Sequence, residues 1–180
     1  MHDLPTRAIW APEIHYVGGV YAIALSMAPG GLSILKSASG KAEGPYVHAF
    51  SPNKPIMNGI DGTLFEDDDG SVYFTYGGAH RLYRLKPDWS GFDGEPHEIA
   101  FDEDHDPAHH GPRCPANNFN DIGREGAVLF KANGRYYLGA ADWPQGRYST
   151  MLVVSDTLLG PYHKRHEAVP CGGGTGFFKD

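Results

Sequence analysis

The chain has 180 residues, of which 41% are hydrophobic and 12% aromatic, so it is long enough for one domain with a substantial core. Its formal net charge of −7 argues against a nucleic-acid partner, because no basic patch is available to neutralise phosphates. Glycine (24) and proline (14) are frequent, which favours short strands and turns over long helices. The longest apolar run, residues 20–25, is too short to cross a membrane, and the first 15 residues lack the apolar core of a signal peptide.

Three segments of the chain repeat one pattern, in which a short apolar strand is followed by a glycine turn and an aromatic strand. They are APEIHYVGGVYAIALS at 11–26, DGTLFEDDDGSVYFTYGG at 61–78 and EGAVLFKANGRYYLGAAD at 125–142. Each turn glycine is followed three residues later by a tyrosine, which gives the pairs Gly18 and Tyr21, Gly70 and Tyr73, and Gly134 and Tyr137. Valine, tyrosine and phenylalanine suit half-buried strands, and DDDG and ANG are hairpin-turn signals. We therefore predict three hairpins of the same kind.

A second marker follows each hairpin. Gly-Pro-Tyr begins at Gly44 and at Gly160, each 26 residues after its turn glycine, and Pro96 has the same offset in the middle unit. Each unit therefore has room for two further strands, and units of about 50 to 60 residues with four strands are typical of β-propeller blades. We predict an all-β chain with blades at about residues 10–52, 59–102 and 123–168 and a further blade from about residue 174. Because propellers close with roughly four to eight blades, we interpret the chain as a fragment.

Two acidic residues occupy the same position in consecutive units. Asp61 and Glu125 each lie nine residues before the turn glycine, and each is followed by a glycine, Gly62 or Gly126. This position is the head of the innermost strand, and in a propeller these heads meet at one mouth of the central channel. Loops 27–30, 77–80 and 142–145 and the long connection 102–124 are predicted at the same mouth. Paired carboxylates in a pocket suit the acid–base chemistry of glycoside hydrolysis.

These motifs, together with WAPEIHYVGGVY and the Gly-Pro-Tyr segments, resemble glycoside hydrolase family 43 over most of the chain. The resemblance implies a five-bladed propeller that hydrolyses arabinosides, xylosides and related glycans with inversion, in a secreted or periplasmic protein. It implies that Glu125 is the general acid and that Asp61 tunes and orients it. The general base should precede Trp10, where Asp3 is the only acid, so we interpret the base as missing and expect little activity from these 180 residues alone.

Candidate substrate-binding residues lie around the predicted mouth. Trp10 and Trp143 either stack on a sugar ring or pack in the core, and Arg124 either contacts the substrate or pairs with a carboxylate. Glu13 either binds substrate or pairs with backbone at a strand start. The remaining candidates are polar residues of the mouth loops, His80 and Asp142, and Thr175, which heads the next inner strand where the family often has a histidine.

No metal or other cofactor is predicted. The histidines of HDPAHH (His105, His109 and His110) do not match a ligand motif, and EDDDG does not match the calcium-loop template. Cys114 and Cys171 form either a disulfide or two free thiols. Two other functions stay open: a non-catalytic propeller that binds glycans or proteins, and a related retaining glycosidase or phosphorylase. The expected partner of the enzyme is an oligo- or polysaccharide, with neither nucleic acid nor a membrane.

Overall fold

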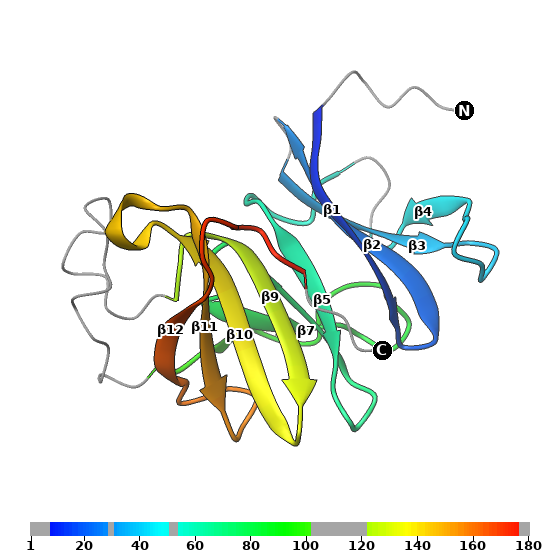
Figure 1. Cartoon of the computed structure of the whole chain (residues 1–180). Helices are drawn as coiled ribbons and strands as arrows, with labels where there is room; N and C mark the ends of the chain where they lie inside the picture. The colour runs from blue at the N-terminus through cyan, green and yellow to red at the C-terminus, as the bar shows by residue number, and fades with distance from the viewer. Residues whose placement is uncertain (1–7, 29–30, 51–53, 102–121, 177–180) are drawn as a thin grey trace.

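The computed structural model describes residues 8–28, 31–50, 54–101 and 122–176, which form three four-stranded sheets (Figure 1). Sheet 1 has the strand order β1-β2-β3-β4, sheet 2 the order β5-β6-β7-β8, and sheet 3 the order β9-β10-β11-β12. The strands are β1 (Ala8–Val17), β2 (Val20–Ala28), β3 (Gly31–Ser37), β4 (Tyr46–His48), β5 (Gly62–Glu66), β6 (Val72–Tyr76), β7 (Arg81–Arg84), β8 (His97–Glu98), β9 (Glu125–Ala132), β10 (Arg135–Asp142), β11 (Ser149–Ser155) and β12 (His163–Val169).

Every pair of neighbouring strands within a sheet is antiparallel, and the described residues contain no α-helix, only the short 3-10 helix η2 (Pro144–Gly146). The predicted all-β class is thus confirmed, with three sheets of the propeller-blade type. Residues 170–176 form no strand, and the residues after 176 lie outside the described part. Within the described residues, no helix is long and apolar enough to cross a membrane.

The repeated tyrosine has the same place in all three sheets. Tyr21 pairs with Tyr16, Tyr73 with Phe65, and Tyr137 with Phe130, so each lies opposite an aromatic residue of the inner strand. The β1–β2 turn at Gly18–Gly19 and the β9–β10 turn at Asn133–Gly134 have positive φ at both central residues. This conformation matches the twist of a two-residue hairpin and favours glycine and asparagine.

The core lies between adjacent sheets rather than on one side of each. In β5, successive side chains point to opposite faces, and Leu64 packs against sheet 1 residues such as Ile34 while Phe65 packs against sheet 3 residues such as Leu138. Both faces of the middle sheet are therefore buried. The inner strands β1, β5 and β9 contact one another in that order, which brings their ends together (Figure 1).

The acidic turn between β5 and β6 contacts both neighbouring sheets. DDDG forms the expected turn, in which the Gly70 N–H donates to the Asp67 carbonyl oxygen at 2.9 Å. Asp67, however, is not a solvated carboxylate: it accepts hydrogen bonds from the Tyr136 hydroxyl at 2.9 Å and from Lys131 at 3.2 Å. Glu66 accepts the Gly18 N–H at 2.9 Å. The turn thus ties sheet 2 to both neighbours, at the end of β5 opposite Asp61.

Candidate active site

Asp61 directly precedes β5 and makes hydrogen bonds to both neighbouring sheets. Its backbone N–H donates to the Ser26 hydroxyl of β2 at 2.9 Å, and its Oδ2 accepts the backbone N–H of Gly126 of β9 at 2.9 Å. Its φ of 56° lies in the left-handed region, which is uncommon for a residue with a side chain, although aspartate tolerates it better than most. Three consecutive sheets therefore meet at this carboxylate.

The glycines that follow the two acids have a steric explanation. Gly126 has a φ of 66°, and a Cβ there would lie 2.9 Å from the Cα of Gly174. At Gly62 a Cβ would lie 2.6 Å from the Phe74 ring. Both positions need glycine for packing, and at Gly126 the close approach also brings the N–H within reach of Asp61.

Glu125 is the first residue of β9 and pairs with Ala141 of β10. The Tyr148 hydroxyl donates to its Oε1 at 2.8 Å. The Tyr148 ring, in turn, lies against Trp143, with 4.7 Å between ring centroids and 43° between the ring planes. Glu125 is therefore half-buried and held by a side chain that reaches it from the loop before β11.

The charge of one predicted acid, Glu125, affects the pKa of the other, Asp61. Burial raises the pKa of Asp61, the Gly126 N–H lowers it, and the charges of Glu125 and then Glu13 raise it further. The net direction is upward, so the site favours a proton on Asp61 compared with water. Such carboxylates with a raised pKa and acidic neighbours are frequent in active sites.

Glu13 is a third carboxylate near this pair, on the inner strand of sheet 1. It lies 3.2 Å from His15 Nε2 and, as a half-buried residue, contributes to the raised pKa of Asp61. The β1–β2 register shifts between Trp10 and Glu13, and Ala11 within this bulge has a φ of 42°. Bulges often occur beside active sites because they redirect a side chain. All three inner strands therefore carry an acid near the mouth.

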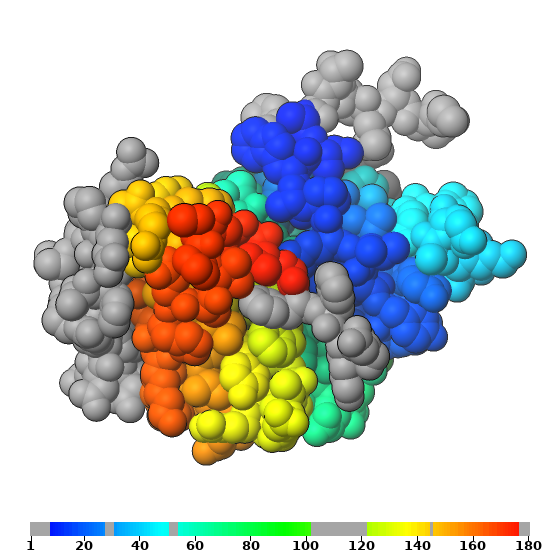
Figure 2. Space-filling model, in the orientation of Figure 1, coloured from blue at the N-terminus to red at the C-terminus, as the bar shows by residue number. Residues whose placement is uncertain are grey.

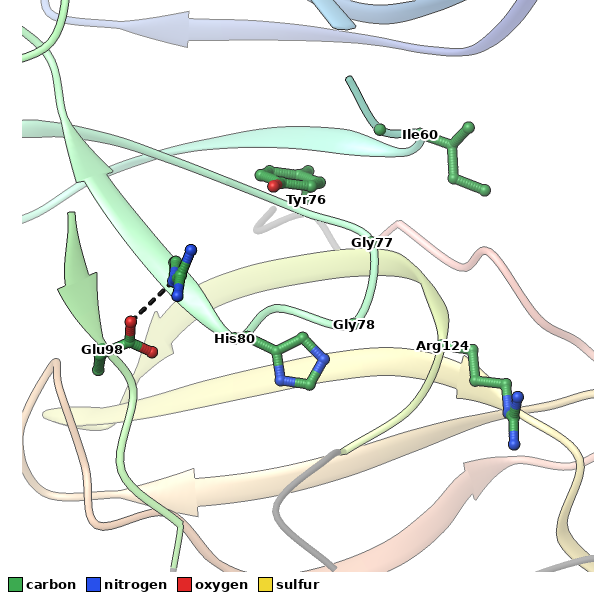
Figure 3. A pocket seen from close by; sticks show the side chains of 9 residues that line it. Ile60, Tyr76, Gly77, Gly78, His80, Glu98 and Arg124 are labelled. Atoms are coloured by element: carbon green, nitrogen blue, oxygen red, sulfur yellow. Dashed lines mark hydrogen bonds and ion pairs between the residues drawn. The ribbon is translucent and has the colours of Figure 1, made fainter. Parts of the chain in front are cut away.

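A pocket of about 610 Å³ is lined by the residues that Figure 3 draws. It does not include Asp61 or Glu125, but it is lined by the residues directly before them, Ile60 and Arg124. Figure 3 shows Gly77 and Gly78 in the loop between Tyr76 and His80. The other lining residues are Gly59 and the ion pair of Arg81 and Glu98, whose Nε and Oε1 are 2.7 Å apart. A volume in this range is typical of small-molecule binding sites.

Asp142 does not have the predicted place on a substrate-facing loop. Its side chain is only 2% exposed, and its Oδ2 accepts a hydrogen bond from Arg165 Nη2. Arg124 Nε lies 3.9 Å from its Oδ1. Asp142 was expected to contact substrate, but its side chain is buried and paired with Arg165. A buried charge needs such a cationic partner. Arg124 lines the pocket and lies next to the Asp142 carboxylate, and its contact with substrate stays a prediction.

The other predicted contacts differ in position. Trp10 is 52% exposed, outside the core, and pairs through its backbone with Ser26, the residue that contacts Asp61. Figure 2 shows β1, in blue, on the molecular surface. Trp143 is half-buried against Tyr148. The Thr175 hydroxyl lies 2.7 Å from that of Thr150, so it is bound to β11 rather than directed to the acids.

Several predictions fall on residues outside the described part: Asp3, the histidines at 105, 109 and 110, Cys114 and most of the connection 102–124. Cys171 is exposed. Among the described residues, no group of three histidine, cysteine, aspartate or glutamate residues is arranged to hold a metal ion.

Sequence reasoning missed Tyr148 and Ser26. Neither has a motif that distinguishes it from an ordinary strand residue; only the packing of sheets 1, 2 and 3 places them next to Asp61 and Glu125.

Comparison with known proteins agrees with this fold. The family model described as glycosyl hydrolases family 43 matches residues 2–171. A curated relative, the Beta-D-galactofuranosidase xynD of Aspergillus niger, is 28% identical over 87% of this chain and 46% of its own. The solved structure of the GH43 BlXynB protein from Bacillus licheniformis is 28% identical, with a TM-score of 0.60 over 88% of this chain and 30% of its own.

A further structure, the alpha-L-arabinofuranosidase CtGH43 from Clostridium thermocellum, shares the fold at 21% identity, with a TM-score of 0.67 over 89% of this chain and 51% of its own. The three four-stranded sheets are blades of a β-propeller, as in these solved structures. This chain belongs to glycosyl hydrolase family 43, and it spans about half or less of the length of these relatives.

Proposed function

We propose that the chain carries the acid side of the active site of a glycosidase that cleaves O-glycosidic bonds with inversion. The observation that carries the proposal is the hydrogen bond between the Asp61 carboxylate and the Gly126 N–H, since it places one acid beside the residue that follows the other. In this mechanism Glu125 donates a proton to the glycosidic oxygen as the bond to the anomeric carbon breaks. A base carboxylate activates a water on the opposite face of the sugar.

Asp61 has two roles in this proposal. Through its hydrogen bond with Gly126 it holds the start of β9, and therefore the backbone of Glu125, in place. When ionised, it is also a negative charge near Glu125. This second role requires Asp61 to be ionised at the working pH, although its own pKa is raised by burial.

We propose that the pocket beside Ile60 and Arg124 takes the leaving-group side of the substrate. In an inverting glycosidase the acid faces the leaving oxygen, so a pocket next to the acid suits the sugar that departs. The pocket offers the groups that bind sugar hydroxyls, namely the Tyr76 phenol, the His80 imidazole and the Arg124 guanidinium. Exposed Trp10 offers an aromatic surface near the mouth for a sugar ring.

The substrate we propose is a glycan of arabinose, xylose or galactofuranose. Two relatives are named as a galactofuranosidase and an arabinofuranosidase, and the pocket, with its paired and polar groups, is compatible with a neutral sugar. A third structure, from Bacteroides thetaiotaomicron, is titled an endo-1,4-beta-xylanase.

The test compares Glu125→Gln with the unchanged protein, expressed from its complete reading frame, on methyl and 2,4-dinitrophenyl glycosides of these three sugars. A general acid contributes about 10² to 10⁴-fold, and only where the leaving group needs a proton. E125Q should therefore lose activity on methyl glycosides and keep most of it on dinitrophenyl glycosides. Glu95→Gln, at an exposed position, is the matched control.

Two outcomes contradict the proposal. Near-normal hydrolysis of methyl glycosides by E125Q would remove Glu125 from the acid role. Product of retained configuration, read by ¹H NMR of the anomeric proton immediately after cleavage, would favour the retaining alternative.

A further inference from the structure

Tyr148 is held in an unusually confined position for an exposed loop. It lies between η2 and β11, its ring packs against Trp143, and the backbone of Gly173 also lies close to the ring. A Cβ at Gly173 would lie 2.1 Å from the Tyr148 Cε1, so only glycine leaves room for this ring. The ring can therefore move little, and the direction of its hydroxyl is determined by packing.

The direction of the Tyr148 hydroxyl matters because the hydroxyl contacts one particular oxygen of Glu125. Tyr148 donates to Glu125 Oε1 at 2.8 Å. A protonated carboxyl has one O–H donor, and an oxygen that accepts a hydrogen bond from a phenol is the carbonyl-type oxygen of that acid. With Oε1 occupied in this way, the transferable proton of Glu125 belongs on Oε2. The terminal torsion of glutamate is otherwise broad and two-fold, so this contact also selects one carboxyl orientation.

We propose that Tyr148 is a positioning residue for the proton donor, which orients the Glu125 carboxyl so that Oε2 delivers the proton to the glycosidic oxygen. This inference rests on the proposed function of Glu125. Tyr148 itself does not touch the reacting atoms; it acts through the carboxyl that it holds. A misplacement of about 1 Å at a reacting group costs on the order of 10²-fold in rate, so an orienting contact can have a large effect.

The electrostatics of the site keep the phenol in its donor form. Burial raises the pKa of Tyr148 well above its usual range, and the hydrogen bond to Glu125 and the charges of Glu125 and Asp61 raise it further. The hydroxyl therefore keeps its proton wherever the protein is folded at ordinary pH. An ionised phenolate would instead repel Glu125.

The first test is kinetic and uses the complete reading frame with the methyl and 2,4-dinitrophenyl glycosides described above. Tyr148→Phe keeps the ring and its packing and removes only the donor. We expect kcat on the methyl glycoside to fall by about 10 to 100-fold, with KM unchanged and with less than about a threefold loss on the dinitrophenyl glycoside, which needs no proton.

Tyr46→Phe is the matched control, because it also removes a hydroxyl that makes one hydrogen bond, to the Ala42 carbonyl oxygen at 2.7 Å, far from the site in sheet 1. It should behave like the unchanged protein. Equal losses by Y148F on both leaving groups, or no loss where E125Q is impaired, would overturn the positioning role. If E125Q itself retains full activity on methyl glycosides, the proposed function fails instead.

The second test needs no activity and examines the contact alone. In this chain labelled with ¹³Cζ-tyrosine, the signal that disappears in Y148F should titrate at higher pH than that of an ordinary tyrosine. Glu125→Gln removes the charge while keeping the shape, so the pKa of Tyr148 should fall, and Asp61→Asn should lower it by less. A Tyr148 titration that E125Q does not change would overturn the contact on which the proposal depends.

Discussion

The Asp61 carboxylate accepts the backbone N–H of Gly126 across the boundary between sheets 2 and 3, with 2.9 Å between Oδ2 and N. Each of the two residues belongs to an acid–glycine pair that recurs in the next sheet, and the bond joins the acid of one pair to the glycine of the other. Strand pairing within a sheet does not provide this link. The hydrogen bond between Asp61 and Gly126 makes the position of Glu125 depend on Asp61.

Gly126→Ala should destabilise the protein and reduce its activity. The backbone at Gly126 has a left-handed φ, in which a Cβ costs about 1 to 2 kcal/mol. The new Cβ would also lie 2.9 Å from the Cα of Gly174. The control is Gly134→Ala, which has a similar φ of 75° but open space around its Cβ. Urea unfolding should give a loss of about 1 kcal/mol for G134A and about 2 to 4 kcal/mol for G126A. Equal losses would show that the contact with Gly174 is of no consequence.

Asp61→Asn should stabilise the fold at neutral pH while it lowers activity. The folded-state pKa of Asp61 lies above its ordinary value of 3.8, so the folded protein binds this proton more tightly than the unfolded chain. Stability therefore falls as the pH rises from about 3.8 through the folded-state pKa, and the neutral asparagine avoids that loss. Asparagine also keeps an acceptor for Gly126 and tolerates positive φ.

Thermal unfolding at pH 7 and pH 3 checks this sign. The higher Tm of D61N at pH 7 should disappear at pH 3, where Asp61 is protonated in both states. Asp69→Asn is a control of opposite sign, because hydrogen bonds from Ser71 lower the pKa of Asp69 and favour its ionised form in the fold. It should lower Tm at pH 7. A D61N variant less stable than the unchanged protein at pH 7 contradicts the prediction.

His80→Ala should weaken the binding of long substrates. If the pocket takes the leaving-group side, kcat/KM for an oligosaccharide should fall by about 10-fold, through loss of one or two hydrogen bonds, while that for a dinitrophenyl glycoside stays within about twofold. His97→Ala, on an exposed strand of the same sheet, is the control. Equal effects on both substrates would place His80 outside the leaving-group site.

Tyr136→Phe should reduce stability without affecting catalysis. Its hydroxyl donates to Asp67 and accepts a hydrogen bond from Lys131 at 2.8 Å, at the end of the sheets opposite the acids. Loss of a hydroxyl that leaves a half-buried carboxylate with fewer donors costs about 1 to 3 kcal/mol. Tyr137→Phe removes a hydroxyl from the next residue and should cost less. Unchanged kcat with a lower urea midpoint is the expected result; a change in kcat would mean that the two ends of the sheets are coupled.

The repeats in the sequence were sufficient to predict the sheets and the positions of the two acids. The three hairpins, their tyrosines and the acid–glycine pairs repeat at fixed spacing, and strand periodicity is local, so Tyr73 and Asp61 could be placed before any contact was known. Because all inner strands run in the same direction relative to the mouth, one repeated position was sufficient to bring Asp61 and Glu125 to the same end.

Which side chains meet at that end depends on how the folded chain packs. Tyr148 reaches Glu125 across 23 residues of chain, and Asp142, the last residue of β10, is buried against Arg165. The Tyr148 contact depends on the close approach of Gly173, and the Asp142 contact depends on where β10 and β12 place Asp142 and Arg165 in sheet 3. A loop sequence carries no periodicity that specifies such contacts, because the burial of a loop side chain depends on what the rest of the chain places around it.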